Sequence, residues 1–177
     1  MLNVKDIEKY LKEINIKLKD SGKTGDIVLA GGAVMALVYG ARNATKDIDA
    51  LFKPSTEMRK IINDIASKYN LPEDWLNDGV KGFFTSNMNK KVYKQYSNLT
   101  IYTLDAEAML ALKLSSARPE SKDQDDSIFL MNVLNIKDVE ELYEIVDKYI
   151  PKNRKTVGSH FFIQDTFDKY KMILSKK

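Results

Sequence analysis

Cysteine is absent from the sequence, and histidine occurs once among its 177 residues. These gaps exclude disulfides, zinc–thiolate sites, thiol nucleophiles and histidine-rich metal sites. The longest run without a charged residue, residues 27–41, is too short to cross a bilayer and contains three glycines. The first residues include early acids and no apolar block. We therefore expect no signal peptide, no membrane association and a cytoplasmic location.

Acidic residues are missing from one part of the chain. Residues 79–104 contain no Asp or Glu but four lysines, while residues 151–177 contain seven basic and two acidic residues. The whole chain has 28 basic and 25 acidic residues and a formal net charge of +3, which says little about partners. Either basic segment could contact nucleic acid, the first through Lys90, Lys91, Lys94, Tyr93 and Tyr96. A solvated strand and a solvated helix face are the simpler interpretations.

Hydrophobic spacing predicts an α+β fold. Apolar residues three and four apart, from Val4 to Leu18, predict a first helix that Asn3 caps at its start and Gly22 ends. A second helix is expected at residues 33–39, and a third starts at a Ser55 cap and ends near residue 69. Short apolar or alternating runs predict strands at residues 26–30, 47–52 and 99–104.

The segment from 71 to 98 is more ambiguous and the last third is helical. We expect a brief helical turn at residues 72–75 and strands at 80–85 and 92–96. Helices then start near residues 105, 123, 137 and 159, the first capped by Asp105. This order predicts a mixed β-sheet with flanking helices over residues 1–104. A C-terminal helical region, residues 105–177, would pack on that core as one compact unit.

Two groups of residues carry the expected chemistry. Gly31 and Gly32 lie between a strand and a helix, where glycine lets the backbone approach a ligand and free amides face an anion. Asp47 and Asp49 are two residues apart on a strand, so their carboxylates point to the same face. Such a pair would repel without a cation, and its oxygen atoms suit Mg²⁺ carried by phosphates.

This arrangement resembles the nucleotidyltransferase superfamily, which shares the fold of DNA polymerase β. It is most similar to small bacterial nucleotidyltransferase-like proteins related to type IV toxin–antitoxin (abortive-infection) toxins. Their first pattern is matched by Gly31, Gly32, Arg42, Thr45, Asp47 and Asp49. Their second, helical pattern is matched by Leu110, Lys113, Leu114, Arg118, Asp123 and Asp126. The resemblance covers about residues 26–134.

The resemblance implies a nucleotidyltransferase fold and a metal-dependent enzyme. Asp47 and Asp49 would hold Mg²⁺ or Mn²⁺, and an acceptor hydroxyl would displace pyrophosphate from a nucleoside triphosphate. Lys113 would join the catalytic groups by pairing with phosphate. The nucleotide-binding residues would be Gly31, Gly32, Arg42, Thr45 and Lys46. The acceptor could be RNA, protein or a small molecule, and a toxin would have an antitoxin protein as partner.

Two departures from the superfamily pattern leave alternatives open. Ala33 stands where many transferases have a hydroxyl, and the acid-free stretch covers the strand expected to bear a third carboxylate. Asp105, Glu107 or Asp126 could replace that acid, or the site has two carboxylates. Lys113 could instead be a snorkelling lysine. Arg42 and Lys46 could neutralise the aspartates, and Asp123 and Asp126 could start a helix.

Three functional hypotheses follow. The first is a metal-dependent nucleotidyltransferase. The second is a catalytically inactive member of the same fold that binds a nucleotide or a partner, which the missing third carboxylate would favour. The third is a nucleic-acid-binding module, which the two basic segments would favour. The single histidine, His160, is flanked by Phe161 and Phe162, and we expect it to be packed or on the surface rather than catalytic.

Overall fold

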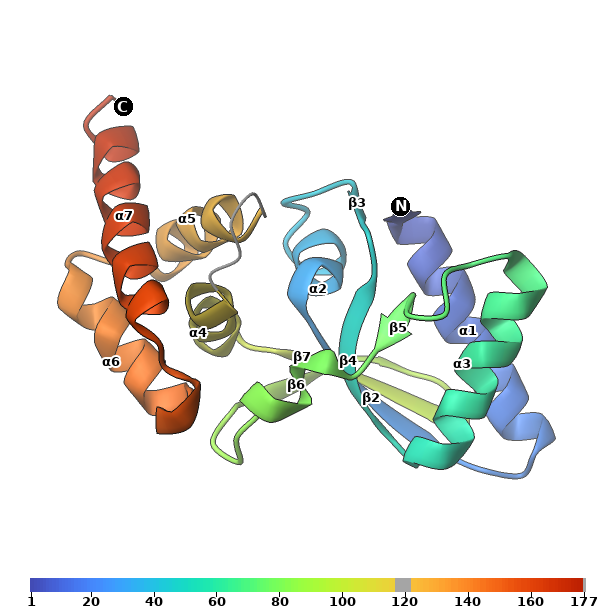
Figure 1. Ribbon diagram of the computed structural model, residues 1–177. Coiled ribbons are helices and arrows are strands. Elements are labelled where there is room, and N and C mark those ends of the chain that lie inside the picture. Colours follow the sequence, from blue (N-terminus) through green and yellow to red (C-terminus); the bar gives the residue numbers. More distant parts are fainter. Residues whose placement is uncertain (117–121, 177) are drawn as a thin grey trace. The chain divides into compact units, whose positions relative to one another are not determined.

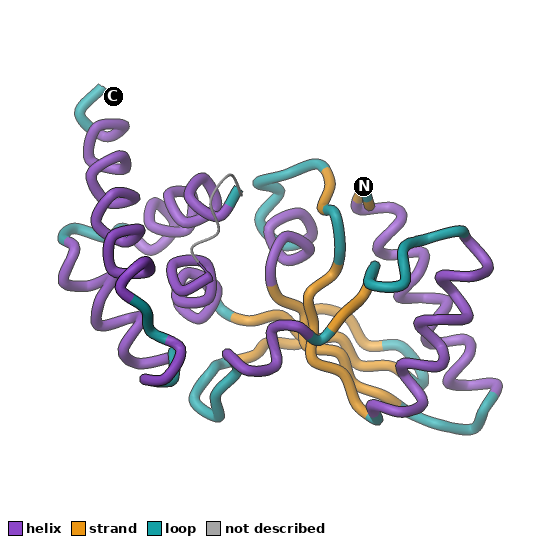
Figure 2. The backbone as a smooth tube through the Cα atoms, in the orientation of Figure 1, coloured by secondary structure: helices purple, strands orange, loops and turns teal. Residues whose placement is uncertain are grey.

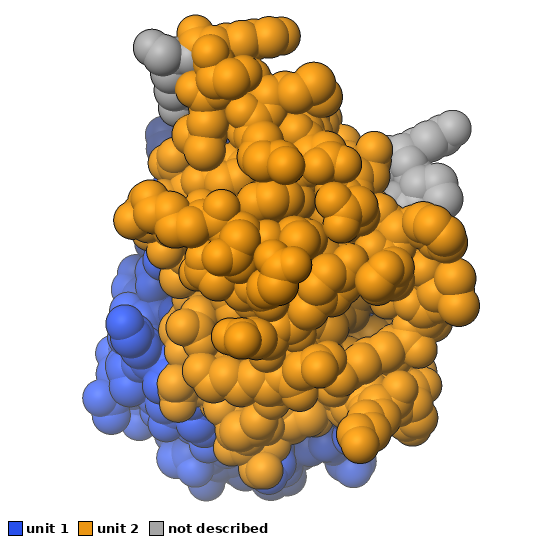
Figure 3. Space-filling model, turned by 90° about the vertical axis from the view of Figure 1, so that its left-hand side faces the viewer, with its two compact units in different colours: residues 1–82, 90–104 blue, residues 83–89, 105–177 orange. Residues whose placement is uncertain are grey.

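The computed structural model describes residues 1–116 and 122–176. The chain forms two compact units, shown in separate colours in Figure 3. Unit 1 contains Met1–Gly82 and Lys90–Leu104, and unit 2 contains Phe83–Asn89 and Asp105–Lys177. Arg118, which belongs to the second sequence pattern, lies outside the described residues. The division into domains 1–104 and 105–177 stays a prediction.

Unit 1 is built on a mixed five-stranded sheet, which confirms the predicted α+β class (Figures 1 and 2). Its strand order is β5-β4-β2-β7-β6. Strand β2 lies antiparallel to β4 and parallel to β7, β4 lies parallel to β5, and β6 lies antiparallel to β7. The strands are β2 (Gly25–Ala30), β4 (Ile48–Lys53), β5 (Leu76–Asn77), β6 (Lys90–Gln95) and β7 (Leu99–Leu104). A separate pair joins β1 (Leu2–Asn3) to β3 (Ala44–Thr45).

Helices α1 (Val4–Asp20) and α3 (Ser55–Tyr69) pack side by side on one face of this sheet (Figure 1). A β-carbon at Gly25 would lie 3.0 Å from Cδ1 of Leu18 and 3.4 Å from Sδ of Met58, so both helices reach the same face. Buried strand residues supply the other half of the core. They are Ile27, Leu29, Ile48, Ala50, Phe52 and Ile101.

The opposite face, here called the open face, is less buried. Val28 is in register with both Leu51 and Tyr102, and Tyr102 is in register with Val92. The first three are half-buried, and Val92 is 58% exposed. Alternation along each strand gives the sheet a helix-covered face and an open face.

Of the helix starts in unit 1, that of α1 follows the sequence, whereas α2 (Gly31–Leu37) starts two residues before its expected start at residue 33, and the predicted cap of α3 is wrong. Asn3 caps α1 as predicted, in a reciprocal capping box with Asp6. Ser55 is not a cap, because Pro54 takes the capping position and Ser55 is the first helical residue without a capping side-chain bond. Proline at the cap fits its preset φ, and α3 is held by packing of its buried face. Helix α2 starts directly after β2.

The segment between α3 and β7 differs most from expectation. Residues 80–85 were expected to form a strand, but a 3₁₀ helix, η1 (Gly79–Phe83), lies there, with Lys81 N–H bonded to Asp78 C=O at 2.9 Å. Residues 72–75 form a single hydrogen-bonded turn, with Trp75 N–H donating to Pro72 C=O at 3.1 Å, close to the expected helical turn. The two-residue strand β5 was missed, because only its pairing with the edge of β4 makes it a strand.

Unit 2 is helical, as predicted. Its elements are α4 (Ala106–Ser116), α5 (Asp123–Leu134), α6 (Val139–Tyr149), η2 (Lys152–Arg154) and α7 (Val157–Leu174). The segment Phe83–Asn89 joins this unit: Thr85 donates a hydrogen bond of 3.0 Å to Tyr149 C=O, and Met88 is buried. None of the helices formed by described residues combines the length and apolar character that crossing a membrane requires.

Candidate functional site

The turn from β2 into α2 brings the first sequence pattern together. Gly31 has φ +62°, in the left-handed region that favours glycine. A β-carbon at Gly31 would contact Oδ2 of Asp49, and one at Gly32 would contact Oγ1 of Thr45 and lie 2.8 Å from Nη1 of Arg42. Five residues that the sequence separates by up to eighteen positions therefore meet at one point of unit 1.

Strand β4 carries the aspartate pair. It starts at Ile48, so Asp47 lies just before the strand and Asp49 inside it, one residue later than the predicted start. Ile48 and Ala50 are buried in the core, while Asp47 and Asp49 are half-buried. Asp49 is in register with Ala30, the residue before the glycine turn. The alternation places Asp49 on the side of the strand away from the core, and Asp47 lies in the bend just before it.

The loop between α2 and β4 supplies the neighbouring polar groups. Thr45 is 3% exposed and is fixed by pairing of β3 with Leu2 of β1. Arg42 is half-buried with its guanidinium at the glycine turn, and Lys46 is exposed. The loop thus places one hydroxyl and one guanidinium at the glycine turn, and carries a second cationic residue, Lys46, next to Asp47 in the sequence. Those are groups that suit a phosphate ester.

The acids at the start of β4 are of the type that holds a hard divalent cation. Mg²⁺ in proteins is commonly held by one or two carboxylates, with phosphates and water completing its coordination. Asp47 and Asp49 provide this number. Within residues 1–116 and 122–176, no group of three or more His, Cys, Asp or Glu is placed to hold a metal ion. A cation here would be completed by its substrate.

The acids considered as a third metal ligand form hydrogen bonds and ion pairs within unit 2. Asp105 caps α4, as predicted, by accepting a 2.9 Å hydrogen bond from Ala108 N–H. Glu107 binds Lys148 at 2.6 Å and the Tyr149 hydroxyl at 3.0 Å. The hydrogen bond from Lys148 holds the pKa of Glu107 below its usual range. Each of these side chains therefore has a structural partner close by.

Lys113 and Asp126, the other two candidates, meet in the core of unit 2. The Lys113 ammonium lies 2.7 Å from Oδ1 of Asp123 and 2.8 Å from Oδ2 of Asp126. All three side chains are at most 6% exposed. The Ser116 hydroxyl donates a further hydrogen bond of 3.2 Å to Asp123. Lys113 is thus a buried, doubly ion-paired residue rather than a snorkelling one, and it ties α4 to the start of α5.

A family model described as nucleotidyltransferase of unknown function (DUF6036) matches residues 5–172. The protein belongs to this nucleotidyltransferase family. The match covers the glycine turn, the aspartate pair and the Lys113 cluster. It confirms the predicted nucleotidyltransferase family, and the relation to toxins stays a prediction. No curated protein and no solved structure matches the chain. Membership implies a nucleotide as substrate.

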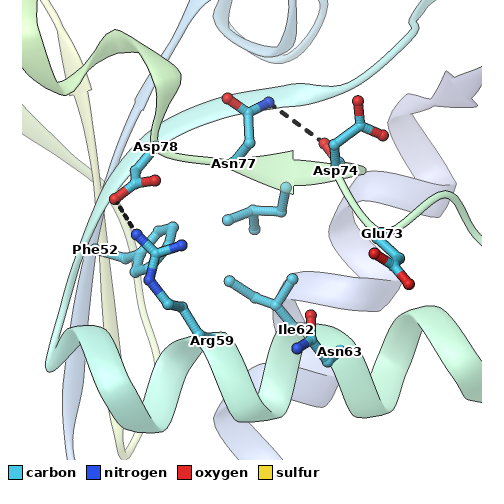
Figure 4. A pocket seen from close by; sticks show the side chains of 9 residues that line it. Phe52, Arg59, Ile62, Asn63, Glu73, Asp74, Asn77 and Asp78 are labelled. Atoms are coloured by element: carbon cyan, nitrogen blue, oxygen red, sulfur yellow. Dashed lines mark hydrogen bonds and ion pairs between the residues drawn. The ribbon is translucent and has the colours of Figure 1, made fainter.

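One neighbour of the acid pair in this nucleotidyltransferase was missed in the sequence. Asn77 of β5 is in register with Asp49. Its side chain bonds within its own loop: Oδ1 accepts a 2.9 Å hydrogen bond from Gly79 N–H. Nδ2 donates one of 3.3 Å to Asp74 C=O, drawn in Figure 4. The sequence offered no signal for it, because a two-residue strand has no periodicity.

Asn77 also lines a pocket of about 280 Å³ at the β5 edge of the sheet (Figure 4). The Arg59 guanidinium lies 2.6 Å from the Asp78 carboxylate there and 5.6 Å from the Phe52 ring centroid. Three acidic side chains, Glu73, Asp74 and Asp78, line the same space. This pocket has no arrangement that would favour the phosphates of a nucleotide.

The basic strand β6 of the nucleotidyltransferase divides its lysines between two faces. Lys90 is in register with Leu104 and its ammonium lies 4.2 Å above the Tyr102 ring on the open face. Lys91 is in register with Thr103, so it points to the other face. Lys94 pairs with Glu8 of α1 at 3.5 Å. In unit 2, His160 stacks on Tyr143 with 4.9 Å between ring centroids, consistent with a packing role.

Proposed function

We propose that the protein is a metal-dependent nucleotidyltransferase that moves a nucleoside monophosphate from a nucleoside triphosphate to an acceptor hydroxyl. The observation that carries the proposal is the convergence of the glycine turn, Thr45, Arg42 and Asp49 where β2 ends and the antiparallel β4 begins. Family membership supports the class of reaction. Localisation in the cytoplasm, expected from the sequence, is part of the same proposal.

In this proposal Asp47 and Asp49 hold Mg²⁺ or Mn²⁺. The ion, when bound, neutralises phosphate charge and stabilises in-line displacement at the α-phosphorus. Arg42 and Lys46 would bind the triphosphate oxygens, and Thr45 would donate a hydrogen bond beside them. The absence of side chains at Gly31 and Gly32 leaves room for the Asp49 carboxylate, the Thr45 hydroxyl and the Arg42 guanidinium beside the backbone, where they would meet the phosphates.

Lys113 and Asp126 have a different place in the proposal. The two carboxylates within 2.8 Å of the Lys113 ammonium weigh against a direct phosphate contact. We assign this cluster the role of holding α4 against α5, which stabilises unit 2. An additional metal-binding role for Asp126 would require it to exchange Lys113 for a cation.

The test measures Mg²⁺-dependent transfer of label from α-labelled nucleoside triphosphates to RNA, protein and small-molecule fractions. Asp47→Asn and Asp49→Asn should each reduce transfer by about 100-fold or more, because each removes a carboxylate from the ion. Asp64→Asn is the matched control, since Asp64 is an exposed acid on α3 paired only with Lys17 at 3.5 Å among the described residues. Equal activity of the wild type and both site variants would overturn the proposal.

The second candidate function is an inactive member of the family that binds a nucleotide or a partner protein. It is favoured by the finding that no three metal-binding side chains gather among the described residues. Thermal unfolding with nucleotide and Mg²⁺ separates the two: a raised Tm without label transfer in any fraction identifies the binding protein. A raised Tm with transfer identifies the enzyme.

A toxin role is the most specific part of the proposal, and it is based on the sequence resemblance alone. It predicts that induced expression arrests bacterial growth, that Asp49→Asn relieves the arrest, and that a cognate antitoxin protein would also relieve it. Growth arrest by both wild type and Asp49→Asn would show that toxicity does not come from this site.

A further inference from the structure

Strand β6 forms one edge of the sheet in unit 1. In the strand order β5-β4-β2-β7-β6 it pairs with β7 on one side, and no strand formed by residues 1–116 or 122–176 pairs with its other side. None of its six residues is buried, and Val92 is 58% exposed. The opposite edge, β5, is only two residues long. Strand β6 is therefore the longer of the two edges at which a further strand could join the sheet.

The backbone groups on the outer side of β6 follow from its pairing with β7. Asn89 C=O accepts a hydrogen bond of 3.2 Å from Asp105 N–H, and in an antiparallel ladder every second residue bonds to the neighbouring strand. Lys91 therefore bonds towards β7, while the N–H and C=O groups of Lys90 and Val92 point away from it. Groups of this kind pair with an extended peptide in β-strand addition.

Charge favours an acidic partner strand. Lys90, Lys91 and Lys94 make up half of β6, and the surrounding stretch, residues 79–104, has no Asp or Glu. In the part of the chain that the structure describes, Lys94 pairs with Glu8 at 3.5 Å, whereas Lys90 and Lys91 form no ion pair. These two lysines are exposed and lie on opposite faces of the strand. A carboxylate on either face of an added strand would therefore meet a lysine.

A second copy of this chain is the less suitable occupant. Two β6 edges side by side would bring the three lysines of each copy together, and like charges opposite each other destabilise a strand pair. The register shift between Val92 and Lys94 also interrupts the edge. Lysines and bulges are common means of preventing identical edges from pairing. The same lysines attract a strand of opposite charge, so they restrict the edge to acidic partners.

We infer that β6 binds an acidic, extended peptide segment of another protein by β-strand addition. The backbone of the segment pairs with the N–H and C=O groups of Lys90 and Val92, its carboxylates lie beside Lys90 and Lys91, and an apolar side chain covers Val92. The register shift limits the paired part to the residues before Lys94. Neither the aspartate pair nor the glycine turn takes part, so the inference goes beyond the proposed function and does not depend on it.

The first experiment measures fluorescence anisotropy of a labelled ten-residue peptide of glutamate, valine and threonine with the full chain, without nucleotide. A peptide with lysine in place of glutamate should not bind. An acidic peptide with N-methyl groups at alternate residues has the same charge but lacks half of its N–H donors, so it should bind at least about tenfold more weakly. Equal binding of the methylated and unmethylated acidic peptides would show attraction by charge alone and overturn the inference.

The second experiment changes the outer edge of β6. Val92→Pro removes an N–H that points away from β7, a position at which an edge strand tolerates proline. It should reduce affinity for the acidic peptide at least about tenfold, whereas Val92→Thr keeps the N–H and should bind within about threefold of the wild type. Wild-type affinity in a folded Val92→Pro variant would overturn the inference. If this variant does not fold, as judged by circular dichroism, the methylated peptide with the wild-type chain decides the same question.

The third experiment tests the lysines. Lys90→Gln and Lys91→Gln should each weaken binding of the acidic peptide about two- to fivefold, the range for one exposed ion pair, and the loss should shrink at high salt. Lys60→Gln is the matched control, because it removes the same charge from an exposed position on α3 and should leave the affinity unchanged. Equal weakening by all three changes would contradict a contact at β6 and overturn the inference.

Other occupants of this edge give different results. A wild-type dimer in sedimentation that Val92→Pro dissociates would show that the edge pairs with a second copy, and would overturn the inference. Failure of the wild type to bind the acidic peptide at millimolar concentration would also overturn it, whether or not single-stranded RNA binds through Lys90 and Lys91. Peptide binding that Val92→Pro abolishes supports the inference with or without label transfer, so the proposed function stands or fails by its own test.

Discussion

Gly31 and Asp49 lie so close that a β-carbon at position 31 would contact Oδ2 of the aspartate and lie 3.2 Å from its Cγ. The glycine also has φ +62°. A side chain at position 31 would therefore displace the Asp49 carboxylate, and a bulkier side chain at position 49 would displace the turn. This relationship links the backbone conformation of one segment to the position of a carboxylate on the next strand.

Gly31→Ala should lower both stability and transfer. The left-handed conformation costs a side chain about 1–2 kcal/mol, and the contact with Asp49 adds to this. Gly22→Ala is the matched control, because Gly22 has φ +66° and nothing within 4 Å of its β-carbon position. Urea unfolding should show about 1–2 kcal/mol lost for Gly22→Ala and more for Gly31→Ala. Transfer should fall only in Gly31→Ala, and equal effects on both measurements would contradict the role of the contact.

Gly32 and Thr45 should be energetically coupled. A β-carbon at Gly32 would contact the Thr45 hydroxyl, so Gly32→Ala should cost about 1–3 kcal/mol of stability through overpacking. Thr45→Ala removes that hydroxyl, and the double variant should recover about 1 kcal/mol relative to the sum of the single changes. Gly32→Ala with Thr103→Ala, a buried threonine of β7, should be additive within about 0.5 kcal/mol. Additivity in both pairs would contradict the predicted contact.

Lys113→Met should strongly destabilise unit 2. It removes the cation from two buried carboxylates, a change that typically costs about 3–5 kcal/mol. Lys155→Met is the control, since Lys155 pairs with an exposed Asp147 and such surface pairs contribute about 0–1 kcal/mol. Thermal and urea unfolding monitored by circular dichroism would measure both. A loss below 1 kcal/mol in Lys113→Met would show that the cluster does not hold α4 to α5.

Glu13 should stabilise unit 1 in a pH-dependent way. Burial raises the pKa of Glu13, but hydrogen bonds from Lys68 at 2.7 Å and the Tyr69 hydroxyl at 2.5 Å outweigh it, so its pKa lies below the ordinary value. A lowered pKa in the folded state adds stability above the unfolded-state pKa, about 4.3, and this is lost as pH falls through the folded-state pKa.

Glu13→Gln should therefore lose about 1 kcal/mol of unfolding free energy at pH 7, and the difference from the wild type should shrink as pH falls below about 4. Tyr69→Phe removes one of the two donors and should show a smaller pH dependence than the wild type. Urea unfolding at pH 7, 4.5 and 3 gives the three differences. A difference that is constant with pH would contradict the assignment of the lowered pKa to these hydrogen bonds.

Local patterns were enough to predict most of the elements. Periodic apolar residues located α1, α3 and the helices of unit 2, and the strands β2, β4 and β7 were expected within one or two residues of their observed bounds. The cap at Asn3 was predicted because its hydrogen bonds involve only neighbouring residues. The same holds for the glycine turn and the two acids, which lie next to strand and helix signals.

Elements that depend on distant partners could not be predicted. Strand β5 exists through pairing with β4, and β1 through pairing of Leu2 with Thr45. The residues around Val80 have the apolar character of a strand, yet they form η1. The burial of Lys113 was also hidden, because its two partners lie on the next helix and spacing alone does not show which face that helix turns inward.

The segment Phe83–Asn89 belongs to unit 2 although it lies between two segments of unit 1 in the sequence, and this limits where the chain can be divided. It precedes β6 and β7 in the sequence, yet Thr85 donates a hydrogen bond to the carbonyl of Tyr149, 64 residues later, and Asn87 to that of Lys148, 61 residues later. A gene cut after Leu104 would keep every strand of the sheet but leave these side chains and the buried Met88 without their partners. Exchange at a single junction after residue 104 therefore cannot transfer unit 2 intact, because one segment of that unit precedes β6 in the sequence.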